Sequence, residues 1–138
     1  MSAGYSGTPL PRKLGIRAGH RVALFGAPDH VEALLDPLPE DVVLEREPEG
    51  GGRDYDVALL FERHTAALER RFASAAGRVR VEGGLWVAWP KKSSPLAADL
   101  AREAVRRVGL EAGLVDVKVC AIDADWSGLR FVVRRQDR

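Results

Sequence analysis

The residues best suited to bind a ligand are two lysines and two serines that follow one another in the chain. The segment is Lys91, Lys92, Ser93, Ser94 and Pro95. Ammonium groups and hydroxyls bind phosphate or carboxylate groups, and a proline favours the first turn of a helix. Because the free N–H groups and the dipole of a helix N-terminus favour negative charge, this segment predicts an anion site. The alternative is that Ser94 only caps the helix while both lysines are solvated.

Two tryptophans and two small polar residues are expected near this lysine–serine segment. They are Trp89, Asp125, Trp126 and Ser127. Indole rings at a ligand-binding edge can stack on a base or another ring, and core packing is an equal alternative for Trp89. A hydrolase triad of Ser127, Asp125 and His64 is rejected, because no strand–turn–helix nucleophile elbow surrounds the serine.

The elements that would position these residues alternate between strands and helices. Apolar or β-branched runs predict strands at 21–25, 42–44, 55–61, 85–89, 115–122 and 129–133. Apolar residues at helical spacing predict helices over 28–36, around 68–75 and over 95–109. This order predicts an α/β fold, a single three-layer domain whose mainly parallel sheet is closed by an antiparallel strand.

The predicted strands also indicate which loops meet. Ligands of open α/β sheets bind beyond the carboxyl ends of the parallel strands. The loops expected at that edge are 26–29, 62–64, 90–94 and 123–127. The last two are expected to be neighbours, because a strand inserted beside the fourth strand carries its turn to the same edge. The sequence therefore predicts one shared rim that holds the lysines, the tryptophans and the aspartate.

Composition limits the classes of function. The chain has 138 residues, enough for one domain, which we place at 14–138 after an N-terminal arm at 1–13. Lys and Arg total 21 against 20 Asp and Glu, so the net charge of +1 gives no overall field for nucleic acid or an anionic membrane. The arginines of the predicted helices have acidic neighbours, which makes nucleic-acid binding unexpected.

The cysteine, the apolar segments and the histidines limit the cellular location and the metal chemistry that we expect. Cys120 is the only cysteine, so no disulfide can form within the chain and a reducing cytoplasm is expected. No apolar stretch approaches the about 18 residues of a membrane span, and no signal-peptide pattern is present. The histidines His20, His30 and His64 lack metal-ligand spacing, so no metal site is predicted.

Several segments resemble known families. Residues 14–22, 54–57 and 83–87, followed by the terminal strand hairpin, are similar to class I SAM-dependent methyltransferases over residues 14–134, with one early strand and helix missing. This resemblance implies a Rossmann-like sheet of order 2-1-3-4-6-5, with strand 6 antiparallel. Residues 4–10, 85–92 and 115–120 resemble more closely a family of short bacterial proteins known only as a domain of unknown function, which implies no activity.

The methyltransferase resemblance also marks candidate cofactor residues, which are Gly26, Asp29 and Glu45, with Glu47 as an alternative acid. The turn after the first strand keeps one glycine and places Pro28 where a second would stand. Two hypotheses stay open. The first is a non-catalytic binding module, without a cofactor, that takes a small anionic ligand or a protein partner at the carboxyl edge of the sheet. The alternative is a SAM-dependent methyltransferase with a degenerate glycine-rich loop.

Overall fold

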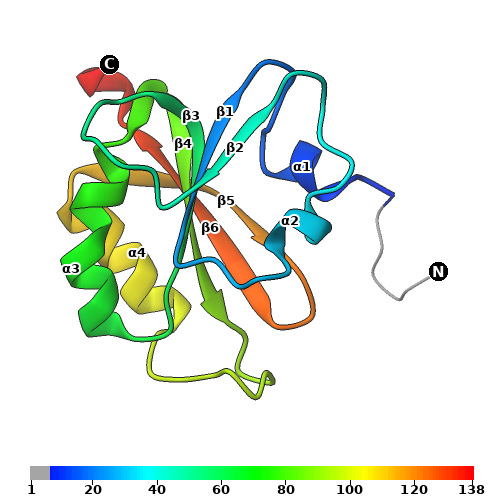
Figure 1. The fold of residues 1–138 in the computed structure, drawn as a ribbon. Helices are drawn as coiled ribbons and strands as arrows, with labels where there is room; N and C mark the ends of the chain where they lie inside the picture. The colour runs from blue at the N-terminus through cyan, green and yellow to red at the C-terminus, as the bar shows by residue number, and fades with distance from the viewer. Residues whose placement is uncertain (1–6) are drawn as a thin grey trace.

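A six-stranded sheet organises the chain, and the computed structural model describes residues 7–138 (Figure 1). The strands are β1 (Arg21–Phe25), β2 (Val43–Arg46), β3 (Tyr55–Phe61), β4 (Val79–Pro90), β5 (Leu114–Ala121) and β6 (Trp126–Val133). Their order is β2-β1-β3-β4-β6-β5. β1 to β4 pair in parallel, whereas β6 runs antiparallel to both β4 and β5. The predicted Rossmann-like α/β class, strand order and direction of strand 6 are confirmed.

Two helical layers cover the sheet. The helices are α1 (Leu10–Lys13), α2 (Val31–Leu34), α3 (Thr65–Ala76) and α4 (Arg102–Glu111). α3 and α4 lie on one face, and α1 and α2 lie towards the other (Figure 1). β3 is buried on both faces, because Leu60 packs on the α3 side while Leu59 packs on the α1 side. This double burial explains why its sequence is a continuous apolar run rather than an alternating one.

Part of the N-terminal arm expected at 1–13 forms a short helix. α1 lies inside the arm expected at 1–13, and residues 1–6 of that arm lie outside the described residues. Among residues 7–138, no helix is long and apolar enough to cross a bilayer.

The predicted start of the last helix at Pro95 is wrong, because α4 begins at Arg102. Ser94 does not cap a helix there. Its Oγ accepts the N–H of Leu96 at 3.0 Å, which closes a local turn. The following segment is held by the loop after β3, since Arg63 Nε donates to Leu96 O at 2.7 Å. Residues 92–101 therefore form turns that cross the carboxyl edge.

The predicted end of that helix at Gly109 is also wrong, since α4 continues to Glu111. Gly109 is buried inside the helix, where a Cβ would overlap the ring of Phe131. The glycine serves close packing of α4 on β6 rather than helix termination. Gly113, with φ of 90°, is the residue at which the chain turns away after the helix.

Two strands begin earlier in the chain than the sequence predicts. β4 begins at Val79 rather than at residue 85, with an irregular register beside Tyr55. β6 begins at Trp126, so that residue is part of a strand rather than of the hairpin turn.

Candidate functional site

A cleft lies between α3 and the carboxyl-terminal parts of β1 and β3. β1 leads to β2 on one side of the sheet and β3 leads to β4 on the other, so their ends form the topological switch point of this fold. The cleft has a volume of about 270 Å³. Its lining is Phe25, Leu60, Arg70, Arg71, Ser74 and Ala75. We call it the switch-point cleft; it combines an apolar floor with two guanidinium groups from α3.

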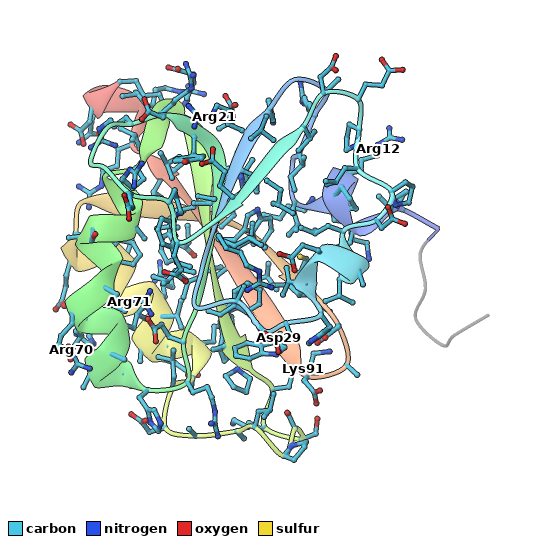
Figure 2. All side chains as sticks on the ribbon, viewed as in Figure 1. Arg12, Arg21, Asp29, Arg70, Arg71 and Lys91 are labelled. Carbon is cyan, nitrogen blue, oxygen red and sulfur yellow. The ribbon has the colours of Figure 1, made fainter. Side chains whose placement is uncertain are left out.

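The two arginines of the cleft differ in their partners, and Figure 2 shows both on α3. Arg71 lies between two carboxylates, 3.3 Å from Glu62 Oε2 and 3.4 Å from Glu47 Oε1. Arg70 is exposed and has no ion-pair partner within residues 7–138. Burial raises the pKa of the Glu62 carboxyl, and the neighbouring arginines partly offset that rise. The cleft thus contains one arginine that is paired with carboxylates, Arg71, and one that is not paired in the described part of the chain, Arg70.

The turn after β1 borders this cleft. Gly26 has a φ of 65°, and a Cβ there would lie 2.7 Å from the carbonyl oxygen of Phe61, so only glycine fits. Its N–H donates to Glu47 Oε2 at 2.5 Å. Glu47 is therefore the acid that lies beside the turn. Glu45, the cofactor candidate marked by the methyltransferase resemblance, lies elsewhere: it pairs with Arg21 at 2.8 Å, and Arg21 begins β1 at the opposite edge.

Arg46 closes the same turn from the end of β2. Its guanidinium donates to Ala27 O at 2.8 Å and to Pro28 O at 2.7 Å, and it pairs with Glu32 at 2.7 Å. A SAM molecule needs free backbone N–H groups and close approach at this turn. Gly26 already donates its N–H to Glu47 and Pro28 has none, so neither of these two residues offers a free backbone N–H at this turn. The third candidate, Asp29, is exposed on the same turn (Figure 2).

The lysine–serine segment and the last hairpin do share a rim, as predicted. Lys91 donates its backbone N–H to Asp125 O at 2.8 Å and its ammonium to Asp123 O at 2.7 Å. His30, just after the β1 turn, bonds Asp123 Oδ2 at 2.9 Å. Asp123 and His30 were missed by sequence reasoning, which considered the carboxylate only as part of a loop.

The side chain of Asp123 joins the loop after β1 to the last hairpin turn, while its carbonyl oxygen accepts the ammonium of Lys91 from a third loop. Although burial opposes ionisation, bonds from His30 and from the N–H groups of Asp125 and Trp126 together lower the pKa of Asp123. Lys92 and Ser93 remain exposed at this rim, so anion binding by them stays a prediction. The ammonium of Lys91 already donates one of its three N–H groups to Asp123 O, and anion binding by it also stays a prediction.

The predicted anion site at a helix N-terminus and the predicted tryptophan wall are not formed. Ser94 is buried, only 7% exposed, and no helix follows it until Arg102. Trp89 packs with the α3 and α4 core, whereas Trp126 packs in the cluster on the opposite face. Trp126 contacts Phe61 edge-on at 5.1 Å between ring centroids. Ser127 lies in β6, paired with Trp89 rather than in a turn.

Metal ligation has no support in the described part of the chain. Among residues 7–138, no group of three or more His, Cys, Asp or Glu side chains could hold an ion. His30 and His64 instead bond Asp123 and Asp99, respectively.

Solved structures of methyltransferases share this fold at low sequence identity. Magnesium protoporphyrin IX methyltransferase from Synechocystis PCC 6803, solved with bound SAH, has a TM-score of 0.59 and 12% identity over 85% of this chain and 75% of its own. A SAM-dependent methyltransferase from Aquifex aeolicus has a TM-score of 0.61 and 10% identity over 89% of this chain and 87% of its own. These similarities show a methyltransferase-like fold.

A solved structure of a protein that is not described as a methyltransferase also shares this fold. A possible exported protein from Bordetella parapertussis has a TM-score of 0.67 and 12% identity over 90% of this chain and 65% of its own. No protein-family model matches the chain, and no curated protein matches it. The resemblance to the family of short bacterial proteins therefore stays a prediction.

Proposed function

We propose that the chain is a non-catalytic binding module that takes a small anionic ligand in the switch-point cleft. The observation that carries the proposal is the pair Arg70 and Arg71 above an apolar floor at the ends of β1 and β3. Ligands of open α/β sheets bind at such a crevice. Because Arg70 has no carboxylate partner among the described residues, it can bind an anion without first breaking an ion pair.

The lining also indicates the kind of anion. Phe25, Leu60 and Ala75 offer apolar contact, whereas Ser74 offers a hydroxyl. A volume of about 270 Å³ suits a small molecule. The ligand class is accordingly a compact carboxylate or monophosphate with an apolar body.

Two contacts support binding without methyl transfer. Glu47 occupies the N–H of Gly26, and Arg46 occupies the carbonyl groups of Ala27 and Pro28. A cofactor at this turn would have to displace both side chains. The cleft beside α3 can be filled while these contacts stay in place.

Thermal shift and calorimetry with benzoate and with inorganic phosphate test the proposal. At least one of these probes should raise the melting temperature of the wild-type chain, because a ligand that binds only the native state stabilises it. Arg70→Ala should abolish the shift. Arg102→Ala, which removes an exposed arginine from the start of α4, is the matched control and should retain it. Equal shifts in wild type and Arg70→Ala would refute this site.

A SAM-dependent methyltransferase is the second candidate, supported by the fold of the solved structures and by the acid beside Gly26. Calorimetry with SAM and with S-adenosylhomocysteine separates the two functions. Binding to the wild-type chain would favour the methyltransferase. Binding only to Glu47→Ala would indicate that this carboxylate blocks the turn, and no heat with either chain would remove the candidate.

We also propose that the protein is located in a reducing cytoplasm. Cys120 is the only cysteine, and burial raises the pKa of its thiol, which keeps it protonated and unreactive. Fractionation of cells that express the tagged chain tests this location.

A further inference from the structure

The opposite edge of the sheet carries a second, larger hollow. At the amino ends of the strands, α1, the loop after it and the strands β3 to β6 enclose a groove of about 500 Å³. Its cationic residues are Arg12, Lys13, Arg17, Lys118 and Arg130. We call it the amino-edge groove. It shares no lining residue with the switch-point cleft.

One buried and one exposed hydrogen bond hold the wall of this groove in place. The indole N–H of Trp86, a fully buried residue, donates to Leu14 O at 2.9 Å. The ammonium of Lys118 donates to Lys13 O at 3.0 Å, which connects β5 to the end of α1. The groove is therefore built from the body of the domain, and its cations are brought together by packing rather than by a free loop.

The charges of the groove are not balanced. Within residues 7–138, none of its five cations forms an ion pair with a carboxylate. Two acids, Asp56 and Glu82, also line it. Asp56 is already engaged, since it accepts the N–H of Arg21 at 2.8 Å and lies 3.5 Å from Arg80. The groove therefore has an excess of positive charge that its own acids do not neutralise.

Arg130 is the most informative of these cations. It lies half-buried in β6, and its Nε has no hydrogen-bond partner. The guanidinium rests against Gly84, where a Cβ would overlap it. Burial lowers the pKa of Arg130, and repulsion from Arg138 and Arg17 adds to this. A partly buried, unpaired guanidinium is costly, and a bound anion would remove that cost.

We propose that the amino-edge groove binds a small ligand carrying two or more phosphate groups. Several cations on separate walls match a multiply charged anion better than a single carboxylate. Guanidinium groups bind phosphate oxygens through two parallel N–H donors, and three of the five cations are arginines. The volume is in the range of small-molecule sites. The proposal is independent of the switch-point cleft, because the two sites lie at opposite edges.

Titration calorimetry of the full chain with inorganic pyrophosphate, at low ionic strength, tests this assignment. The wild-type chain should bind, and Arg17→Ala and Lys118→Ala should each weaken binding by about tenfold, as expected for the loss of one charge-assisted contact. Arg102→Ala is the matched control, because it removes one exposed arginine that lines neither the groove nor the switch-point cleft. This variant should keep the wild-type Kd.

Gly84→Ala offers a variant without any change of charge. The added methyl should displace the guanidinium of Arg130 and weaken pyrophosphate binding, while circular dichroism reports whether the chain still folds. Should this variant unfold, Arg17→Ala and Lys118→Ala decide alone.

Three results would overturn the proposal. The first is an unchanged Kd in both Arg17→Ala and Lys118→Ala. The second is sulfate binding as tightly as pyrophosphate, which would indicate unspecific screening. The third is binding of a short single-stranded RNA without binding of pyrophosphate, which would indicate a macromolecular partner instead.

Discussion

The carboxyl edge of the sheet and the amino-edge groove differ in how their charged side chains are paired. At the carboxyl edge, arginines and histidines pair with carboxylates, mostly between different loops and elements. The pairs are Arg71 with Glu62 and Glu47, Arg46 with Glu32, His30 with Asp123, and His64 with Asp99. At the amino edge, five cations line one groove and none has a carboxylate partner among the described residues.

This difference shows that the edge at which a fold usually binds ligands need not be the edge whose cations are free to bind an anion. The carboxyl edge is where this fold binds ligands, yet an incoming anion there must compete with Glu47 and Glu62 for Arg71. At the amino edge, an anion would meet cations that repel one another. Charge balance therefore favours the amino edge for a multiply charged ligand, and leaves the carboxyl edge to a ligand small enough to use Arg70.

The largest expected effect concerns the backbone at each edge, where two glycines allow a matched comparison. Gly26 and Gly19 have φ of 65° and 80°, so alanine at either position costs roughly 1 kcal/mol of backbone strain. At Gly26 the methyl would also meet Phe61 O, whereas nothing lies within 4 Å at Gly19. Urea denaturation should show that Gly26→Ala lowers the free energy of unfolding by about 2–4 kcal/mol and Gly19→Ala by only about 1 kcal/mol. Equal losses would mean that the β1 turn is not tightly packed.

An intermediate effect concerns one arginine from each edge. Arg71→Ala should lower the free energy of unfolding by about 1–2 kcal/mol, because it leaves the carboxylate of Glu62 buried without its cation. Arg17→Ala removes a cation from among like charges, so its effect should stay within about 0.5 kcal/mol of zero. Denaturation of both variants near neutral pH measures the contrast.

The pH dependence of these variants adds a second readout. Burial raises the pKa of Glu62 above its unfolded value, so folding is favoured while this carboxyl is protonated and loses that support as pH rises through the folded pKa. The deficit of Arg71→Ala should therefore shrink in acid, where the neutral carboxyl needs no cation. A deficit independent of pH would show that Arg71 acts through packing alone.

The sequence predicted the sheet well because strand burial leaves a direct pattern. Continuous apolar runs such as 21–25 and 55–61 can only be buried on both faces, and alternation with helices then fixes a parallel sheet. The start of α4 was not predictable in the same way. Ser94 and Pro95 have the residue types of a helix start, but Ser94 closes a turn with Leu96 instead.

The candidate site was less predictable because its contacts are long-range. Arg70 and Arg71 have the pattern of a solvated helix face, and nothing local indicates that Arg71 meets Glu47, which is 24 residues away. Glu45 and Glu47 look alike in sequence, but Glu47, which has a φ of 44°, is the one that bonds the turn after β1. The amino-edge groove depends on α1 meeting β5, a contact that no local pattern encodes.

The smallest expected effect tests whether the carboxyl-edge pairs are electrostatically coupled. The hydrogen bond from His64, followed by that from the N–H of Thr65, lowers the pKa of Asp99 to about 2 from its ordinary 3.8. Because the folded pKa is depressed, the stabilisation is present above the unfolded value and is lost as pH falls towards 2. Carboxyl-detected NMR titration should place Asp99 near that value in the wild-type chain.

Two histidine variants decide the cause of this shift. His64→Ala should return the pKa of Asp99 towards 3.8, whereas His20→Ala, which changes a histidine of the amino-edge groove, should leave it unchanged. If Asp99 titrates at its ordinary value in the wild-type chain, the His64 contact does not persist in solution. The carboxyl edge would then have an exposed carboxylate and an exposed imidazole that act on ligands separately, and its contrast with the amino-edge groove would rest on the pairs of Arg71, Arg46 and His30.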